Sequence, residues 1–270
     1  MSIVACVKVY DGIVLGAESM TQLTATVQGQ QQVIKSYENA QKLFRVGIFP
    51  VGVLTYGAGN IGRRSIESFV REFSRSEEGR QDKTVNVEQI SARFLAFMRN
   101  HYLGAFGSMQ QDQLPVMGFL IAGYSDGQHL ASEWEFILPQ DSQPRPVREQ
   151  DGIGASWRGI GAPFTRLWFG VDPTMEQLLL AKGASKPEVD RVNQVARESL
   201  HTRIAFDGMP LQDAVHFCRF IIQTTIGWCT YALGSPACGG PIKLATITPS
   251  PGGFAWVTSP KLYLGGEEHA

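Results

Sequence analysis

The first residues alternate between apolar, β-branched runs and a turn, which predicts a β-hairpin. Ser2 to Tyr10 is rich in Val and Ile and is typical of a strand. Asp11-Gly12 favours the positive φ angles of a tight hairpin turn, and Ile13 to Ala17 returns as the second strand. A further short strand pair is predicted at Gln41 to Val46 and Val51 to Tyr56.

Two amphipathic helices are predicted after these strands. Gly57 to Gly62 forms a tight turn into the first helix, which runs from Arg63 to about Arg75. Asn86 starts the second, with Gln89 placed for a capping box. Apolar residues recur at helical spacing in both, namely Ile66, Phe69, Val70 and Phe73 in the first and Ile90, Phe94, Leu95, Met98 and Tyr102 in the second.

The remainder of the chain predicts a second strand pair, a group of helices and a closing hairpin. The strands are Leu114 to Gly123 and His129 to Pro139; the helices are Phe164 to Phe169, Thr174 to Ala181, Glu188 to Arg203 and Pro210 to Leu233; the hairpin is Lys243 to Thr248 with Gly253 to Thr258. Polar or charged loops are expected at Glu18 to Gln32, Ser74 to Lys83 and Asp141 to Gln150.

The order of these elements predicts an α+β fold. Hairpins rather than alternating strands and helices imply antiparallel sheets. The expected architecture is a four-layer α-β-β-α sandwich, in which helices flank two antiparallel sheets. No linker, internal repeat or low-complexity segment interrupts the chain, so residues 1–270 are expected to form a single domain.

Composition narrows the range of partners. A net charge of −1 gives no electrostatic footprint for nucleic acid or for an anionic membrane surface. No apolar run is long enough to span a bilayer, and Lys8 and Asp11 interrupt the apolar N-terminal region, which argues against a signal peptide. We therefore expect a cytoplasmic protein without nucleic-acid or membrane partners.

The cysteines indicate packing rather than metal binding. Cys6, Cys218, Cys229 and Cys238 contain no close C-x-x-C pair, and the histidines do not cluster with them. We expect reduced, buried thiols, no metal and no organic cofactor.

An ordered set of segments resembles the proteasome β-subunits. A small hydroxyl residue, Ser2, follows Met1 and opens the first hairpin. The other matching segments are Lys42-Leu43-Phe44, Tyr56-Gly57-Ala58-Gly59, Met117 to Pro139, Pro210 to Ala214 and Cys238-Gly239-Gly240. No single segment is decisive, but their order is specific. The chain is similar to bacterial proteasome homologues built from one subunit type, with additional residues near Leu23 to Ser36 and Gly170 to Lys186.

This resemblance implies an N-terminal-nucleophile endopeptidase of the threonine or serine type. Removal of Met1 would leave Ser2 with a free α-amine, and the ordinary pKa of such an amine, about 7.7–8.0, suits a general base for its own hydroxyl. Lys42 would stabilise the alkoxide-like transition state and Glu18 would hold Lys42. The backbone N–H of Gly59 would face the developing oxyanion. Lys35 is a rival for the role of Lys42, because the additional residues make the alignment ambiguous.

Several positions depart from the family's pattern. Glu18 stands where the family has Asp, and Met20 stands where it has Arg. Ala162, Ser235 and Cys238 stand where the family has a supporting serine, an aspartate and a second serine. These differences leave open a second reading, a ring-forming scaffold with the same fold but no turnover.

A third reading concerns a nucleotide-binding motif. Gly57-Ala58-Gly59-Asn60-Ile61-Gly62 matches G-x-G-x-x-G, and Glu88 lies at about the expected distance downstream. The hairpins before the motif argue against a dinucleotide-binding βαβ unit, so this reading is the least favoured.

The resemblance also implies partners. Self-assembly into rings of six or seven subunits, stacked in pairs, is expected. The substrate would be a peptide or unfolded protein, delivered by an unfoldase ATPase.

Overall fold

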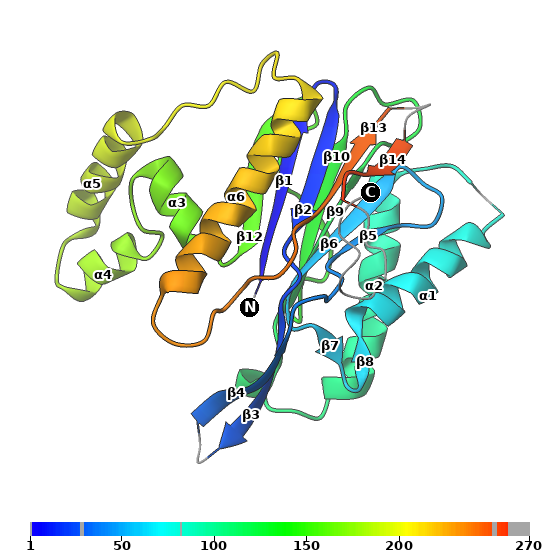
Figure 1. Ribbon diagram of the computed structural model, residues 1–270, viewed down its shortest axis with the longest axis horizontal. Coiled ribbons are helices and arrows are strands. Elements are labelled where there is room, and N and C mark those ends of the chain that lie inside the picture. Colours follow the sequence, from blue (N-terminus) through cyan, green and yellow to red (C-terminus); the bar gives the residue numbers. More distant parts are fainter. Residues whose placement is uncertain (1, 28–29, 82, 250–252, 259–270) are drawn as a thin grey trace, which may run out of the picture.

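The computed structural model describes residues 2–27, 30–81, 83–249 and 253–258, which form two five-stranded sheets with helices on their outer faces (Figure 1). In the first sheet every adjacent pair of strands is antiparallel. Its order is β12 (Gly154–Gly159), β1 (Ile3–Val9), β2 (Gly12–Ala17), β13 (Lys243–Thr248) and β14 (Gly253–Trp256). The N-terminal strand β1 is therefore paired on both sides.

The second sheet is also antiparallel throughout. Its order is β11 (Arg145–Pro146), β10 (Ser132–Leu138), β9 (Met117–Gly123), β6 (Val51–Gly57) and β5 (Leu43–Arg45). Val4 and Cys6 of the first sheet pack against Leu54 and Leu120 of the second in one buried cluster. The two sheets thus face each other across a shared core.

Helices cover the outer face of each sheet. The first sheet packs against α3 (Ala162–Phe169) and α6 (Leu211–Tyr231), and the second against α1 (Ile66–Glu78) and α2 (Val87–Phe106). Alternation along β1 explains this layering, because Ala5 and Val7 point towards α6 while Val4 and Cys6 point towards the other sheet. The mixed α+β class with antiparallel sheets is confirmed. All four cysteines are buried and free.

Two elements differ from the expected loops. A β-hairpin formed by β3 (Thr21–Val27) and β4 (Gln30–Tyr37) replaces the polar loop expected from Glu18 to Gln32 and projects from the body of the molecule (Figure 1). We call this hairpin the arm. The strand β12 was not expected at all, yet it forms an edge of the first sheet beside β1.

The helix boundaries also need correction. The first helix continues to Glu78 through part of the expected charged loop, and it begins at Ile66 rather than Arg63 because Asn60–Ile61 (β7) pairs with Arg64–Ser65 (β8). The helices expected at Thr174 to Ala181 and Glu188 to Arg203 are α4 (Met175–Ala181) and α5 (Lys186–Ser199). A short 3₁₀ turn, Gln111–Gln113, precedes β9.

The dinucleotide-binding reading is wrong on structural grounds. The strand before Gly57 to Gly62 lies in an antiparallel sheet, and α1 starts only at Ile66, capped by the Ser65 hydroxyl. Glu88 lies in the first turn of α2 rather than at the end of a parallel strand. The glycine motif spans the end of β6, the turn at Ala58-Gly59 and the short strand β7, without the βαβ unit that a dinucleotide-binding motif requires.

No helix in the part of the chain that the structure describes is long and apolar enough to cross a membrane.

Candidate functional site

Ser2 lies at the start of β1, almost fully buried at 3% exposure. Its carbonyl oxygen accepts a hydrogen bond of 2.7 Å from the backbone N–H of Ile160, directly after β12. Gly159 has φ = +88°, and a Cβ there would lie only 1.9 Å from the Ser2 carbonyl oxygen. A glycine is needed at this point because any side chain would displace Ser2.

Glu18 and Lys42 form a buried ion pair. The Lys42 ammonium donates to Glu18 Oε1 and to the carbonyl oxygen of Met20. The side chains of Lys42 and Glu18 are 9% and 0% exposed. The second carboxylate oxygen, Oε2, accepts from the N–H groups of Met20, at 2.7 Å, and Gly239, at 3.1 Å. Both oxygens of Glu18 are therefore engaged.

Burial lowers the pKa of the Lys42 ammonium from its ordinary value, and the Glu18 carboxylate opposes this shift. Without that partner the charged lysine would be strongly disfavoured at this depth. Glu18 thus has a definite physical task, which is to keep a buried cation charged.

The loop before β13 completes the support of Glu18. The Gly239 carbonyl oxygen accepts from the N–H groups of Ser19, at 3.1 Å, and Met20, at 2.9 Å. Its own N–H donates to the carboxylate, as described above. Cys238 is buried, and burial is the main cause that raises the pKa of its thiol. The sequence did not reveal Gly239 as a site residue, because it acts only through its backbone.

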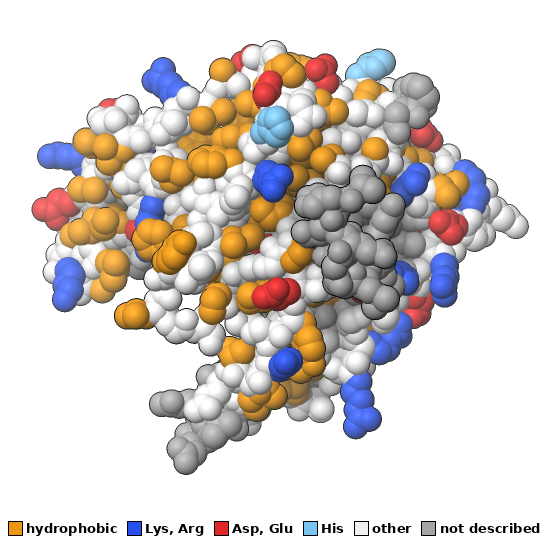
Figure 2. Space-filling view, in the orientation of Figure 1, with side chains coloured by type: hydrophobic (Ala, Val, Ile, Leu, Met, Phe, Trp, Pro, Cys, Tyr) orange, Lys and Arg blue, Asp and Glu red, His pale blue; other side chains and the backbone are white. Residues whose placement is uncertain are grey.

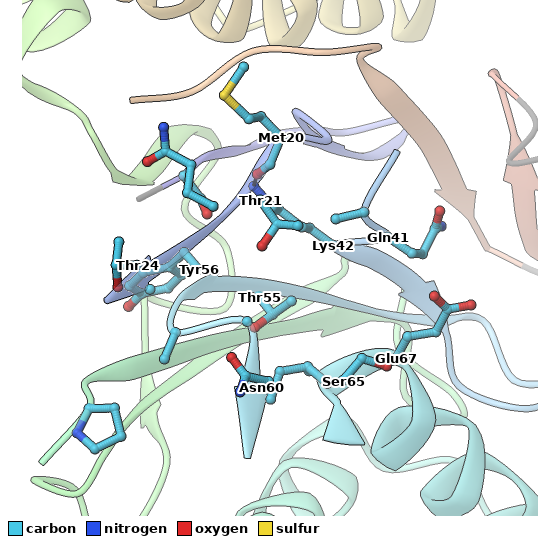
Figure 3. Close-up of a pocket in the computed structure, with 18 of the residues that line it drawn as sticks. Met20, Thr21, Thr24, Gln41, Lys42, Thr55, Tyr56, Asn60, Ser65 and Glu67 are labelled. Atoms are coloured by element: carbon cyan, nitrogen blue, oxygen red, sulfur yellow. Dashed lines mark hydrogen bonds between the residues drawn. The ribbon is translucent and has the colours of Figure 1, made fainter. Parts of the chain in front are cut away.

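The Glu18–Lys42 pair adjoins a cleft of about 700 Å³, shown in Figure 3, which Lys42 lines. Ser2, Lys42 and Gly59 all contribute to it. One wall comes from the arm and the other from the start of α1 and the end of α2. The remaining lining residues are Met20, Thr21, Gln22, Thr24, Val33, Ala40, Gln41, Thr55, Tyr56, Gly57, Ala58, Asn60, Ser65, Ile66, Glu67, Phe106 and Pro115.

Gly59 lies in the turn between β6 and β7 at the edge of the cleft. Its carbonyl oxygen accepts from the N–H of Ile66, at 3.1 Å, which ties the turn to the first residue of α1. The rival lysine, Lys35, lies on the exposed strand β4, with its ammonium 5.8 Å from the centre of the Tyr37 ring. The structure therefore brings Ser2, Lys42, Glu18 and Gly59 to one region and leaves Lys35 outside it.

Of the positions that differ from the proteasome pattern, Met20 lies at the cleft, whereas Ala162 and Ser235 lie away from it. Met20 is buried, lines the cleft and supplies the carbonyl that Lys42 binds. Ala162 is the first residue of α3, and Ser235 lies exposed in the loop after α6. Neither Ala162 nor Ser235 lines the cleft.

No protein-family model and no curated protein matches the sequence. Many solved structures are similar to this one, among them two Anbu structures. The structure of Anbu (ancestral beta-subunit) from Yersinia bercovieri has a TM-score of 0.52 and 13% identity, covering 94% of this chain and 87% of that chain.

The structure of the helical assembly of the Anbu complex from Pseudomonas aeruginosa has a TM-score of 0.51 and 15% identity, covering 91% of this chain and 81% of that chain. The chain shares the Anbu fold. The prediction that it is a proteasome β-subunit is corrected by this finding, because Anbu proteins are proteasome-like in fold but form a distinct family. At these identities the likeness concerns the fold alone.

Proposed function

We propose that the chain is an N-terminal-nucleophile hydrolase that cleaves peptide bonds with Ser2, after removal of Met1. Met1 lies outside the described residues. The observation that carries the proposal is the buried Glu18–Lys42 pair, which lies at the same cleft as Ser2. Desolvating a lysine and its carboxylate costs free energy, and stabilisation of a transition state is a task that accounts for keeping such a pair.

The chemistry would proceed in two steps. The Ser2 oxygen attacks the peptide carbonyl carbon while its proton passes to the Ser2 α-amine, and that proton then goes to the leaving amine as the C–N bond breaks. Water hydrolyses the resulting ester and restores the hydroxyl. The Lys42 charge would stabilise the developing negative charge, and the Gly59 N–H would donate to the oxyanion.

The glutamate at position 18 is compatible with this role. Its side chain is one methylene longer than that of the aspartate expected from the resemblance. The N–H groups of Met20 and Gly239 donate to one carboxylate oxygen, Oε2, and the other oxygen, Oε1, accepts from Lys42. The longer side chain is thereby fixed in one position, which the precision of catalysis demands.

We further propose that the layers described above form the four-layer sandwich of N-terminal-nucleophile hydrolases and constitute one domain. The shared core between the two sheets, with members from β1, β6 and β9, supports a single unit. The likeness to Anbu structures supports the overall arrangement.

Self-assembly is part of the proposal. The Pseudomonas aeruginosa Anbu structure is described as a helical assembly. In this chain, α6 and the residues after it expose large apolar side chains, including Trp228, Tyr231 and Leu233. Contact between copies would cover these groups and enclose the clefts in a compartment, as a ring or as a helix of subunits.

The test is intact-mass spectrometry of the purified protein, with and without a peptide epoxyketone. This reagent forms its ring adduct only with a hydroxyl and a free α-amine on the same residue. We expect a protein that lacks Met1 and gains one adduct, and an unmodified mass for Ser2→Ala after the same treatment.

Retention of Met1 without adduct formation would contradict the peptidase. The fold would then support the second candidate function, a catalytically silent, self-assembling scaffold. The observation favouring this alternative is that Ala162 and Ser235, which replace the supporting serine and aspartate, do not line the cleft.

A further inference from the structure

One buried hydroxyl in the cleft has no assigned task. Thr55 lies near the end of β6 and is only 4% exposed. Its Oγ1 has no hydrogen-bond partner among the described residues. A buried hydroxyl without a partner loses its interaction with water and gains nothing in exchange, so it calls for an explanation, and a hydrogen bond to a bound ligand is one.

The strand geometry places Thr55 beside the proposed catalytic lysine. Val51 and Val53 of β6 pack into the cluster beneath α1 and α2, and alternation puts Thr55 on the same face. The backbone N–H of Thr55 donates to the Lys42 carbonyl oxygen at 2.9 Å, so the two residues are neighbours on adjacent strands. Both line the cleft (Figure 3).

The next residue on this face of β6, Gly57, places no side chain between Thr55 and the cleft. Gly57 has φ = +87°. A Cβ at position 57 would lie 2.5 Å from the Val116 carbonyl oxygen, so a larger residue is excluded there. The absence of a side chain at position 57 is therefore fixed by the backbone.

The side-chain amide nitrogens and the charged groups that line the cleft already have partners. The amide nitrogens of Gln22 and Asn60 donate to backbone carbonyls at 2.8 Å each. Lys42 is paired with Glu18, and Glu67 is paired with Arg71 at 2.5 Å. The charges are balanced, so a charged substrate side chain would enter without a counter-charge.

We propose that Thr55 is a specificity-determining residue that selects an uncharged, hydrogen-bonding substrate side chain, such as that of threonine, at the residue whose carbonyl Ser2 attacks. This inference rests on the proposed function and names its substrate class. An isosteric apolar side chain would fill the same volume but leave the Thr55 hydroxyl unpaired. The preference for the hydroxyl is expected to be about tenfold.

The experiment compares peptidyl-Thr and peptidyl-Val aminocoumarin substrates of otherwise identical sequence. We expect kcat/KM to favour threonine about tenfold in the wild type. Thr55→Val should abolish or reverse this ratio, and Thr55→Ser, which keeps the hydroxyl, should retain it. Thr246→Val, on strand β13 away from the cleft, is the matched control and should leave the ratio unchanged.

A parallel binding measurement separates this inference from the proposed function. Peptidyl-Thr and peptidyl-Val amides are titrated into Ser2→Ala by calorimetry, with and without Thr55→Val. A hydroxyl preference that disappears in the Thr55→Val background supports the selectivity even if no variant turns over substrate. Equal affinities, no binding of either amide, or a preference that survives Thr55→Val would overturn it.

Discussion

At the scale of single residues, three donors determine the state of the candidate site. The Lys42 ammonium and the N–H groups of Met20 and Gly239 together hold the Glu18 carboxylate. A buried pair of this kind contributes little net stability, because desolvating both charges costs about as much as their attraction returns. Removing one partner alone is costly, about 3–5 kcal/mol in comparable cases. A gain in stability therefore does not explain the pair, in agreement with the catalytic role proposed for it.

A different buried group makes stability depend on alkaline pH. The Tyr124 hydroxyl is buried without a hydrogen-bond partner among the described residues, and burial, with a smaller contribution from Asp11, raises its pKa to about 12. The unfolded tyrosine ionises near a pH of about 10. Since the folded state keeps its proton longer, unfolding releases a proton between these values and becomes more favourable as the pH rises.

We expect Tyr124→Phe to preserve or slightly raise stability at about pH 8, because it removes an unpaired buried hydroxyl. Between about pH 8 and pH 11 the variant should lose less of its free energy of unfolding than the wild type, by about 1 kcal/mol. Urea unfolding at both pH values measures this difference. Tyr10→Phe, at an exposed position, is the control. Parallel losses in wild type and Tyr124→Phe would refute the explanation.

At the scale of elements, the arm contributes side chains to the cleft although it lies outside the two main sheets. It supplies Thr21, Gln22, Thr24 and Val33 to the cleft, while most of its strand pairing is internal. A two-stranded hairpin with few contacts to the body adds little to the stability of the whole. The arm can therefore be altered without loss of the fold.

We expect a shortened arm to weaken substrate binding without unfolding the protein. Joining Leu23 directly to Lys35 through an Asn-Gly turn removes Thr24 and Val33 from the cleft and should raise KM several-fold, with kcat nearly unchanged. Joining Thr24 to Val33 in the same way is the matched control, because these residues are cross-strand partners and both are kept. Thermal melting within about 3 °C of the wild type should accompany both changes. Equal KM values for the two variants would remove the arm from the substrate site.

Among the strands, some were predictable from the sequence and others were not. The strands of the two central hairpins were predictable, because β-branched residues and turn signals mark them. The arm was missed although Leu23, Ala25 and Val27 alternate with polar residues, because the stretch from Glu18 to Gln32 is polar overall and was interpreted as a loop. The strand β12 was missed because Gly154 and Gly159 at its ends and the polar Arg158 within it give no strand pattern.

The sequence predicted those members of the candidate site that a residue type reveals, but not those that act through strand register or backbone groups. Ser2, Glu18, Lys42 and Gly59 were identified through residue types in the resemblance. The role proposed for Thr55 and the hydrogen bonds of Gly239 were not predicted, because they depend on strand register and on backbone groups. Neither the register nor the direction of a backbone N–H is visible in the sequence.

At the scale of the whole molecule, apolar side chains gather on one face. Figure 2 shows them over the region of α6 and of the helices beside it. Tyr231 is 91% exposed, and Leu233 is as exposed as in an extended chain. Groups of this size in water favour association. This is the surface that the proposed assembly would bury.

We expect the double variant Tyr231→Glu, Leu233→Glu to reduce the assembly to smaller species while the melting temperature of the subunit stays unchanged. Charges introduced at a buried contact would oppose association, whereas the folded monomer already exposes both positions to water. Mass photometry over a range of protein concentrations measures the distribution. Ile48→Glu, an exposed apolar position in the turn between β5 and β6, is the control and should assemble as the wild type does. An unchanged distribution for the double variant would place the contact elsewhere.

The buried position of Ser2 at the start of β1 has a practical consequence for producing the protein. Its carbonyl oxygen accepts a hydrogen bond from Ile160, Gly159 leaves no room for a side chain beside it, and the residue as a whole is buried. An affinity tag fused ahead of Ser2 would convert the α-amine, the proposed general base, into a peptide amide and would add residues at this buried position. Preparations with such a tag would then test a blocked or distorted site. A cleavable fusion that leaves Ser2 as the first residue avoids this artefact and gives every assay above its proper starting material.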